Sequence, residues 1–476
     1  MADATTPTPT LPAQTTTEPA TETAQGALPR LAVVGTGYLG ATHAAAMAEL
    51  GMRVVGVDTD QSKVDALSAG KVPFFEPGLP EMLTRNVDAG LLSFTTDLPS
   101  AVDGADVAFV CVGTPQAPAS NAADLRYVDA AVTAVAAAAT SDLLIVGKST
   151  VPVGTADRLR GIVARTVAAS VAAGTLPADA VVELVWNPEF LREGKAVDDT
   201  LSPDRIVVGG ASPRAEALLR AVYATPLSSG IPFVSCDLPT AELVKVSANA
   251  FLATKISFIN AIAQVCEVAG GDVAVLADAI GHDARIGRQF LNAGLGFGGG
   301  CLPKDIRALM HRAGELGANW AVSLLQDVDE INMWQRQRVL DMAVEACGGS
   351  VLNRRVGVLG AAFKPLTDDV RDSPALNVAA ALHLRGAQVT VFDPEAGEAA
   401  RRLYPTLTYA TSTEDAVSGV DVVLLLTEWD EFRTADPAAL APLTKHPVLV
   451  DARACIDPAT WRAGGWTVRT LGRPRA

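Results

Sequence analysis

A glycine-rich turn near the start of the chain limits the fold more than any other feature. Gly35, Gly37 and Gly40 have the spacing G-x-G-x-x-G, directly after the apolar run 31–34 and before an alanine-rich stretch that reaches residue 50. Asp58 then ends a second apolar run. A strand, a glycine turn, a helix and an acid at the end of the next strand form the fingerprint of a β-α-β unit that binds a dinucleotide.

Each residue of this turn has a physical role in the fingerprint. Gly35 permits the tight turn, Gly37 lets a pyrophosphate approach the bare backbone, and Gly40 lets helix and strand pack closely. We expect Asp58 to accept hydrogen bonds from ribose hydroxyls and to repel a 2′-phosphate, which favours NAD over NADP. Lys63 is placed to reach the ribose or a phosphate, with an exposed helix lysine as the alternative. For the whole motif, the alternative is a glycine turn that binds a different ligand.

The rest of the chain alternates in the same way, with one interruption. Apolar runs at 107–112 and 143–146 are separated by alanine-rich helical stretches, and a second series begins at 355–362. Between the two series, from about residue 239 to 346, only helical periodicity is present. We therefore predict an α/β fold of two Rossmann-like, doubly wound domains joined by a central helical region. The predicted parts are residues 1–28 (tail), 29–225 (NAD-binding domain), 226–346 (helical dimerisation domain) and 347–476 (nucleotide-sugar-binding domain).

Composition excludes some classes of function. A net charge of −15 and a pI near 4.8 argue against broad nucleic-acid binding, which needs a basic surface. No uninterrupted apolar run reaches about 18 residues, so we expect no membrane span and a cytoplasmic location. The cysteines form no C-x-x-C pair, so we expect reduced thiols and no metal site. Residues 1–28 are rich in Thr, Pro, Ala and Glu, which predicts a disordered tail rather than a signal peptide.

Two polar pairs have a spacing of four residues. Glu189 and Glu193 would share one face of a helical turn, where like charges repel, and a solvated acidic face is the alternative. Lys245 and Asn249 lie in an otherwise apolar helical segment, so they need polar partners if they are buried. A ligand, or a carboxylate such as that of Glu189, would supply those partners. A surface-facing stripe is the alternative for the second pair.

A third cluster surrounds Cys301. Five of the seven residues from 294 to 300 are glycines, which leaves the backbone open to close approach by a ligand. Cys301 follows them at the predicted start of a helix, with Pro303 in the first turn. A helix N-terminus lowers the pKa of a thiol, and Lys304 adds positive potential, so we predict a reactive thiolate. Asp305, one turn further on, is placed to orient a water or a lysine.

Two threonines follow predicted strands directly. Thr114 lies in the turn after residue 112, and Thr150 lies in the segment 149–152. Ligands in open α/β sheets bind at the carboxyl ends of strands, so both hydroxyls are candidate contacts, with ordinary turns as the alternative.

Taken together, these segments closely resemble the UDP-glucose/GDP-mannose dehydrogenase family. The likeness extends from about residue 31 to residue 453. It rests on the segments GTGYLG, STVPVG, NPEFLREG, KVSANAFLATKISFIN, RIG, GFGGGCLPKD and FKPLTDDVRDSP. Gly300 departs from the pattern, since the family often has serine before the nucleophile.

The resemblance implies a two-step, four-electron oxidation of the C6 alcohol of a nucleotide sugar by NAD. It implies that Cys301 forms a thiohemiacetal and then a thioester. Lys245 and Asn249 would stabilise the developing oxyanion, and Glu189 and Asp305 would act through water as bases, with Thr150 nearby. UDP-glucose is the expected substrate, with GDP-mannose or a UDP-N-acetylhexosamine as the alternative.

The resemblance also implies ligand contacts. Those expected for NAD, besides the glycines of the turn, are Tyr38, Leu39, Asp58, Lys63, Thr114, Thr150, Glu193 and Arg371. Those expected for the nucleotide sugar are Glu189, Phe190, Leu191, Lys245, Asn249, Arg285, Phe290, Asn292, Gly298, Phe363, Lys364 and Arg453. Arg285 would reach the ligand from a neighbouring subunit, in keeping with a homodimer or a higher homo-oligomer. A non-catalytic, NAD-binding regulator on the same fold is the alternative of a different class.

Overall fold

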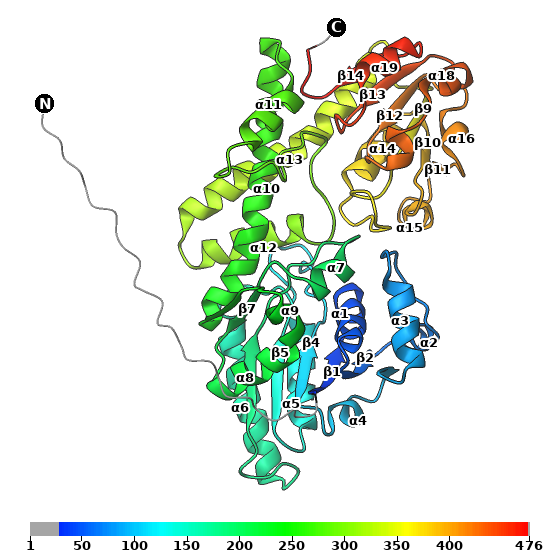
Figure 1. Cartoon of the computed structure of the whole chain (residues 1–476). Coiled ribbons are helices and arrows are strands. Elements are labelled where there is room, and N and C mark those ends of the chain that lie inside the picture. Colours follow the sequence, from blue (N-terminus) through cyan, green and yellow to red (C-terminus); the bar gives the residue numbers. More distant parts are fainter. Residues whose placement is uncertain (1–27, 475–476) are drawn as a thin grey trace, which may run out of the picture.

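The computed structural model describes residues 28–474. The predicted tail falls almost wholly on residues 1–27, which lie outside the described part. Figure 1 shows one sheet in the lower half of the molecule, a second sheet at the upper right, and long helices that run between them. This arrangement confirms the predicted fold of two Rossmann-like domains joined by helices.

The first sheet has eight strands in the order β3-β2-β1-β4-β5-β6-β7-β8. All its neighbours pair in parallel except β6 and β7. Its strands are β1 Arg30–Val34, β2 Arg53–Val57, β3 Leu92–Thr95, β4 Val107–Val110, β5 Leu143–Gly147, β6 Val182–Trp186, β7 Ile206–Gly209 and β8 Phe233–Cys236. Its helices are α1 Tyr38–Glu49, α2 Gln61–Ser68, α3 Leu79–Asp88, α4 Leu98–Val102, α5 Arg126–Ala138, α6 Thr155–Ala172, α7 Ala196–Leu201, α8 Pro213–Val222 and α9 Ala224–Ser228.

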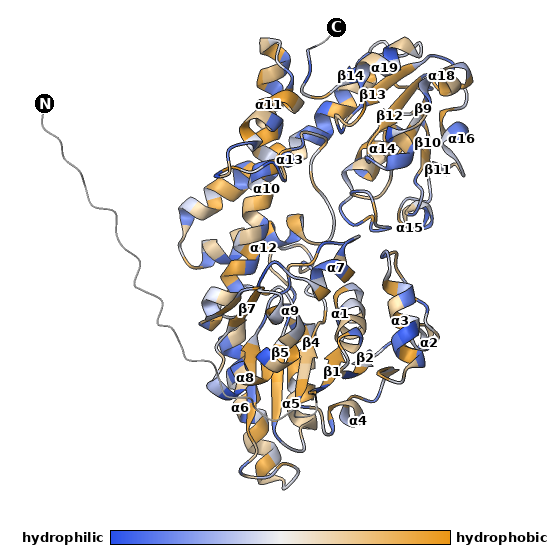
Figure 2. Ribbon diagram, viewed as in Figure 1, coloured by the Kyte–Doolittle hydropathy of each residue, from blue (hydrophilic) through white to orange (hydrophobic). Residues whose placement is uncertain are grey.

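The central strands of this sheet are buried on both faces. Every residue of β4 and β5 is buried, because helices cover the sheet on its two sides. Figure 2 shows these strands as the most hydrophobic ribbons of the lower domain. Continuous Val, Ile and Leu runs of this kind are typical of parallel strands.

The last strand of the first sheet lies beyond the predicted domain boundary. β8 pairs with β7 from Ile206↔Phe233 to Gly209↔Cys236. The sheet therefore continues past residue 225, where the sequence placed its end. The sequence did not predict β8 because it is an edge strand of only four residues, two of which are exposed, and so has no clear apolar run.

Four helices follow the first sheet: α10 Leu238–Ala269, α11 Val273–Gly281, α12 Leu302–Glu315 and α13 Asn319–Ala346. Asp237 begins α10 by accepting a hydrogen bond from the backbone N–H of Thr240, and Pro239 occupies the first turn. Helix α10 packs against α12 and α13, and α13 continues to the second domain.

Helix α10 is long and apolar enough to cross a membrane by length and composition, and it is the one such helix within residues 28–474. The sequence criterion of an uninterrupted apolar run did not identify it. Its buried residues include Glu242, Lys245 and Asn249, and it packs against α12 and α13. Buried polar side chains with partners inside the protein are typical of a core helix.

The second sheet has six parallel strands in the order β11-β10-β9-β12-β13-β14. They are β9 Arg355–Leu359, β10 Gln388–Phe392, β11 Thr408–Tyr409, β12 Val422–Leu425, β13 Val448–Asp451 and β14 Thr467–Thr470. The helices of this domain are α14 Pro374–Leu384, α15 Gly397–Leu403, α16 Thr413–Val417, α17 Asp430–Arg433, α18 Pro437–Leu440 and α19 Pro458–Ala463, with the short η1 Ala441–Leu443. The segment 360–373, between β9 and α14, faces the first domain.

Candidate active site

The glycine turn after β1 has the geometry that a pyrophosphate needs. Gly35 has φ +90°, and a Cβ on Gly40 would lie 1.8 Å from the carbonyl oxygen of Gly35. Helix α1 therefore packs directly on the turn, as expected for Gly40. A Cβ on Gly37 would meet no protein atom within 4 Å, so this position faces open space at the N-terminus of α1. The three glycines fit a bound dinucleotide.

Asp58 lies beside this turn. Its Oδ2 accepts hydrogen bonds from the backbone N–H of Thr36 at 2.9 Å and from Nζ of Lys63 at 2.9 Å. Partial burial acts to raise the pKa of Asp58, but the hydrogen bonds from Lys63, Asp60 and Thr36 outweigh it and hold the pKa below its usual value. The carboxylate is therefore charged at neutral pH. Lys63 lies at the turn rather than on a separate exposed face.

The corresponding acid of the second domain, Asp393, makes its hydrogen bonds to groups of the protein itself. Asp393 follows β10 and accepts hydrogen bonds from the backbone N–H groups of Ala361, Ala362 and Ala396. It also accepts one from Nε1 of Trp429, and it is 5% exposed. This carboxylate has no free face for a ribose, which agrees with the missing glycine fingerprint in the second domain.

Cys301 is the N-cap residue that directly precedes α12, after the glycine-rich segment, and it is exposed. The predicted effect of this position on the thiol is wrong. Desolvation by the surrounding protein groups, and then the carboxylates of Asp305 and Glu189, raise the pKa of Cys301 to about 12, while Lys245 acts to lower it. The thiol is therefore protonated in the free protein, because desolvation and the two carboxylates outweigh Lys245.

Lys245 is buried and has a carboxylate partner, as the sequence predicted. It projects from α10, is 4% exposed, and its Nζ lies 2.9 Å from Oε1 of Glu189. Burial acts to lower the pKa of Lys245, but Glu189 and Cys301 outweigh it and raise the pKa above its usual value. The sequence anticipated Glu189 as a partner for this buried lysine.

Asn249, one turn further along α10, belongs to a chain of polar contacts. Its Nδ2 donates to Oδ2 of Asp305 at 2.7 Å, and Oδ1 of Asp305 lies 2.6 Å from Nζ of Lys304. Lys304 also lies 3.5 Å from Oγ1 of Thr114, which donates to the carbonyl of Thr150 at 2.7 Å. The chain joins α10 and α12 to the ends of β4 and β5. Thr150, Lys304 and Asp305 also line a small cavity there.

The segment 187–195 between β6 and α7 is not helical, so the predicted common face of Glu189 and Glu193 is wrong. Glu189 faces Lys245, whereas Glu193 faces the second domain. Oε2 of Glu193 accepts from Thr367 at 3.2 Å, and Oε1 lies 3.3 Å from Nη2 of Arg371. Burial, and then the charge of Asp369, raise the pKa of Glu193 to about 7.

The second domain also contacts the glycine-rich segment before Cys301. A Cβ on Gly300 would lie 2.4 Å from the guanidinium carbon of Arg371, and one on Gly299 would lie 2.8 Å from the ring of Phe363. A Cβ on Gly298 would lie 2.4 Å from the carbonyl oxygen of Asp372. These glycines are needed for the two domains to meet beside the thiol. Lys364 adds a contact through Nζ to the carbonyl of Glu193 at 2.5 Å.

Several predicted ligand contacts lie elsewhere or have other partners. Arg285 is exposed and pairs with Asp283, and Asn292 is exposed in the segment between α11 and α12. Phe290, in the same segment, adopts φ +63°. Arg453 donates to the carbonyls of Leu426, Gly296 and Phe363 and so holds the domain interface together.

Tyr38 and Phe190 have partners that the sequence did not predict. The hydroxyl of Tyr38 donates to Glu76, which also accepts from the backbone N–H groups of Gly194 and Ala196. The ring of Phe190 lies between Arg205, at 3.8 Å, and Lys245, at 5.7 Å. Glu76 was missed because its partners lie far away in sequence; the one visible signal was an acid directly before a Pro-Gly pair.

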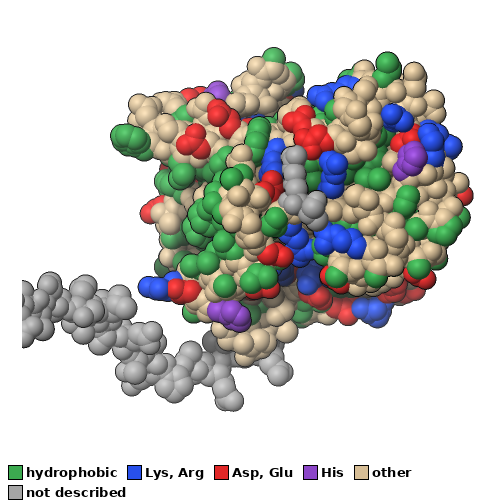
Figure 3. Space-filling view, turned by 90° about the horizontal axis from the view of Figure 1, so that it is seen from above, with side chains coloured by type: hydrophobic (Ala, Val, Ile, Leu, Met, Phe, Trp, Pro, Cys, Tyr) green, Lys and Arg blue, Asp and Glu red, His purple; other side chains and the backbone are tan. Residues whose placement is uncertain are grey.

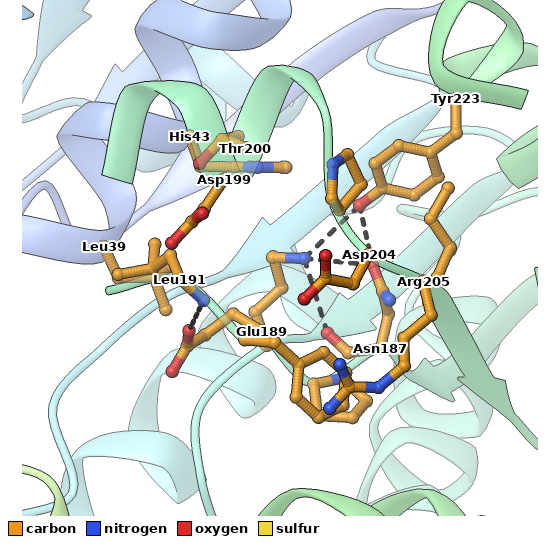
Figure 4. Close-up of a pocket in the computed structure, with 15 residues that line it drawn as sticks. Leu39, His43, Asn187, Glu189, Leu191, Asp199, Thr200, Asp204, Arg205 and Tyr223 are labelled. Atoms are coloured by element: carbon orange, nitrogen blue, oxygen red, sulfur yellow. Dashed lines mark hydrogen bonds between the residues drawn. The ribbon is translucent and has the colours of Figure 1, made fainter. Parts of the chain in front are cut away.

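A cavity of about 60 Å³ lies behind the loop that carries Glu189. Figure 4 shows Leu39 and His43 of α1 on one side, with Leu191, Asn187 and Tyr223 around it. The backbone N–H of Leu191 donates to Oε2 of Glu189 at 2.7 Å. Lys148, which also lines the cavity, was missed by the sequence analysis. No group of three or more His, Cys, Asp or Glu side chains within residues 28–474 is arranged to hold a metal ion.

Comparison with known proteins gives the same three-part division. Residues 29–227 match the NAD binding domain of the UDP-glucose/GDP-mannose dehydrogenase family, residues 239–334 its central domain, and residues 357–458 its UDP binding domain. A UDP-glucose 6-dehydrogenase of Bacillus subtilis is 41% identical over 94% of this chain and 93% of that protein. One of Rhizobium meliloti is 41% identical over 94% of this chain and 100% of that protein.

Solved structures agree with these relatives. A UDP-glucose dehydrogenase from the archaeon Pyrobaculum islandicum aligns with a TM-score of 0.83 and 38% identity over 94% of this chain and 100% of that one. A UDP-D-ManNAc dehydrogenase from Pyrococcus horikoshii aligns with a TM-score of 0.80 and 25% identity over 93% of this chain and 99% of that one.

Proposed function

The chain belongs to the UDP-glucose/GDP-mannose dehydrogenase family, and on this premise we propose that it oxidises UDP-glucose to UDP-glucuronate with two equivalents of NAD. One observation carries the proposal: Cys301 shares a single site with Lys245, Glu189 and the Asp305 network. A thiol, a buried cation and paired carboxylates supply what a covalent aldehyde oxidation requires.

UDP-glucose is favoured over the alternative substrates by similarity. The relatives named for it are 38–41% identical to this chain, against 25% for the UDP-D-ManNAc dehydrogenase. GDP-mannose and UDP-N-acetylhexosamines remain the alternative substrates. A panel of nucleotide sugars assayed for NADH release tests the choice. UDP-glucose should be used at least about 100-fold more efficiently than the others, with two NADH released per sugar, and no release with any sugar would contradict the proposal.

NAD is the cofactor of the family, and the glycine turn, Asp58 and Lys63 fit it. We infer that Gly37 and the N-terminus of α1 face its pyrophosphate, and that Asp58 faces the adenosine ribose, whose 2′-phosphate in NADP it would repel. When bound, NAD accepts a hydride in each of the two oxidations. Thr114, Glu193 and Arg371 are proposed to meet its nicotinamide end.

In the first oxidation, the C6 hydroxyl must lose a proton as C6 loses a hydride. We propose that Glu189 or Asp305 takes this proton through a water. Nζ of Lys245 and Nδ2 of Asn249 donate to the C6 oxygen as negative charge develops on it. Both donors are held in place by carboxylates before the substrate arrives, so they need little reorganisation.

In the second half of the reaction, Sγ of Cys301 adds to the C6 aldehyde and forms a thiohemiacetal. Because the thiol is protonated in the free protein, its proton must pass to a base, and Asp305 is the neighbouring carboxylate. Loss of the second hydride from C6, and of the hydroxyl proton, leaves a thioester. Water then attacks the thioester, which releases the carboxylate product and restores the thiol. Covalent attachment also keeps the aldehyde in the site.

We also propose that the protein is a homodimer that packs through the helical region. Helix α10 exposes Phe251, Phe258 and Val265, each seven residues after the last and therefore on one face. Trp320, at the start of α13, is 90% exposed. Figure 3 looks down on the molecule and shows hydrophobic side chains gathered on the side of these helices. Contiguous exposed apolar patches mark protein interfaces.

A cytoplasmic location remains part of the proposal. The six cysteines within the described residues are free thiols, which suits a reducing compartment. Fractionation of cells that express the chain tests it, with the protein expected in the soluble cytoplasmic fraction.

A further inference from the structure

Lys148 is a buried cation that the proposed mechanism does not use. It follows β5 directly, at the end of a fully buried strand, and is 6% exposed. Its Nζ donates to Oδ1 of Asn187 at 3.0 Å, to the carbonyl of Asn187 at 3.5 Å and to the hydroxyl of Tyr223 at 3.3 Å. All three acceptors are neutral. Because an ammonium held only by neutral groups is costly to bury, its presence calls for a reason beyond stability.

The three residues together fix the start of the loop that carries Glu189. The hydroxyl of Tyr223 donates to Oδ1 of Asn187 at 2.7 Å, and Nδ2 of Asn187 donates to the carbonyl of Val207 at 2.8 Å. Every polar atom of the Asn187 side chain is therefore bonded. Glu189 lies two residues further along and pairs with Lys245. Figure 4 shows Asn187 and Tyr223 on the same side of the cavity, joined by the hydrogen bond from the Tyr223 hydroxyl.

We propose that Lys148 is a positioning residue: its ammonium holds Asn187 and so brings Glu189 to Lys245 beside Cys301. The proposal rests on the proposed function, because it concerns the same site. Glu189 pairs with the buried Lys245 and also acts electrostatically on the buried Lys148. Loss of the Lys148 ammonium frees Asn187 and lets the loop leave Lys245.

The groups around Lys148 make its charge sensitive to pH. Burial lowers the pKa of Lys148 to about 8, Cys111 and Glu189 act against this, and Lys245 adds to it. Burial, and then Lys148, hold the pKa of His43 well below its usual value, so His43 is neutral. Burial raises the pKa of Cys111 to about 12, and burial also raises the pKa of Tyr223 above its usual value, so both groups keep their protons.

Other charged groups line the same cavity. They are Asp199, Asp204 and Arg205 from α7 and the segment before β7, and Asp199 is paired with Arg192. Glu189 is thus the anion that acts on Lys148 from within the catalytic site. The cationic form of Lys148 makes the bonds to Asn187. We therefore expect kcat to be at its maximum below pH 8 and to fall as pH rises through about 8.

The first test is Lys148→Met, which keeps the length of the side chain and removes the charge. Lys195→Met is the matched control, because Lys195 is exposed at the end of the same loop. For Lys148→Met we expect kcat to fall at least about tenfold at pH 7, a KM for NAD within twofold of the parent, and no fall of kcat around pH 8. Lys195→Met should match the parent within twofold. A folded Lys148→Met protein with the parent's kcat and pH profile would overturn the proposal.

Tyr223→Phe is the second variant, in case Lys148→Met does not fold. It removes one acceptor of the ammonium, so the alkaline fall of kcat should move to lower pH. An unchanged midpoint would count against the positioning role.

A readout without turnover separates this inference from the proposed function. Displacement of Glu189 removes a carboxylate that raises the pKa of Cys301 and frees Lys245, so iodoacetamide should alkylate Cys301 faster in Lys148→Met or Tyr223→Phe than in the parent. Peptide mass spectrometry measures the rate at this cysteine alone. If the parent fails to oxidise any sugar, the proposed function falls, and an equal alkylation rate in parent and variants would overturn the positioning role itself.

Discussion

The reactivity of Cys301 depends on the carboxylates around it as much as on the helix it begins. The position at the start of α12 favours a thiolate, but desolvation, and then the carboxylates of Asp305 and Glu189, reverse that preference. Lys245, the opposing cation, is already paired with Glu189. The free protein therefore holds its proposed nucleophile as a thiol, and the proposed attack on a carbonyl requires transfer of the proton to a neighbouring base.

This arrangement predicts slow modification of an exposed cysteine. With the pKa of Cys301 raised to about 12, iodoacetamide at pH 8 should alkylate it at least about 100-fold more slowly than free cysteine, and the rate should still rise between pH 9 and 11. Peptide mass spectrometry of the unliganded protein gives the rate. A rate equal to that of free cysteine, level above pH 9, would show that the thiolate is already stabilised.

Glu193 makes the contact between the domains dependent on pH. Its pKa is raised from 4.5 to about 7, so the folded protein binds a proton here that the unfolded chain releases between these values. The associated stability is full below pH 4.5 and is lost as pH rises through about 7. Glu193→Gln should remove this loss and gain up to about 2 kcal/mol at pH 8 relative to the parent.

Urea unfolding of the parent and of Glu193→Gln at pH 5 and pH 8 measures this difference. The urea midpoint of the parent should fall more between the two pH values than that of the variant. Equal falls would mean that Glu193 is ionised throughout. Glu183→Gln, in β6 and away from the domain contact, serves as the control.

Among the elements, local patterns predicted the site where one helix or one turn determines the geometry. Lys245 and Asn249 share a face of α10 because four residues are about one helical turn, and both are buried against partners as the apolar context required. The glycine turn after β1 was equally readable. Lys148 was not, because its partners are Asn187 and Tyr223, and only the order of strands brings these positions together.

In the loop 187–195, the local sequence pattern did not predict the conformation. A spacing of four suggested a common helical face for Glu189 and Glu193, but this segment has no helical structure. Glu76 accepts hydrogen bonds from the backbone N–H groups of Gly194 and Ala196, and so fixes the turn at the end of the loop. Contacts of this range outweigh the local spacing, and they cannot be read from the loop's own residues.

Substitution of Gly40 and of Gly37 should have different effects, the first on helix packing and the second on cofactor binding. Gly40→Ala would place a Cβ 1.8 Å from the carbonyl oxygen of Gly35, so it should destabilise the fold by about 3 kcal/mol or more. Gly37→Ala has no protein neighbour within 4 Å and should leave the melting temperature within about 2 °C. It should nevertheless weaken NAD binding at least about tenfold, since the methyl group occupies the pyrophosphate's approach.

Thermal melting and calorimetric titration with NAD distinguish the two variants. Normal NAD affinity in a stable Gly37→Ala protein would place the cofactor elsewhere.

The whole molecule presents the proposed catalytic residues where the two domains meet, beside a helical region with an exposed apolar face. Arg285 lies far out on this region and is 89% exposed, with Asp283 as its ion-pair partner. A second subunit packed on α10 would cover the apolar face and would bring surface residues of one chain towards the other. The proposed dimer and the proposed role of Arg285 at a partner's site are therefore linked.

Replacement of the two phenylalanines tests the dimer. Phe251→Glu with Phe258→Glu places two charges on the exposed face of α10, which should convert a dimer of about 98 kDa into a monomer of 49.2 kDa in light scattering. Val275→Glu, exposed on α11, is a control that should remain dimeric if the interface is centred on α10. A monomeric parent at micromolar concentration would contradict the assembly.

The covalent mechanism is tested most directly by counting NADH per sugar in Cys301→Ala. The parent should release two NADH for each UDP-glucose consumed and should form the acid. The variant should still bind NAD, but net acid formation should fall by about 10³-fold or more, because no thioester can form. Two NADH per sugar at the parent's rate in Cys301→Ala would contradict the account.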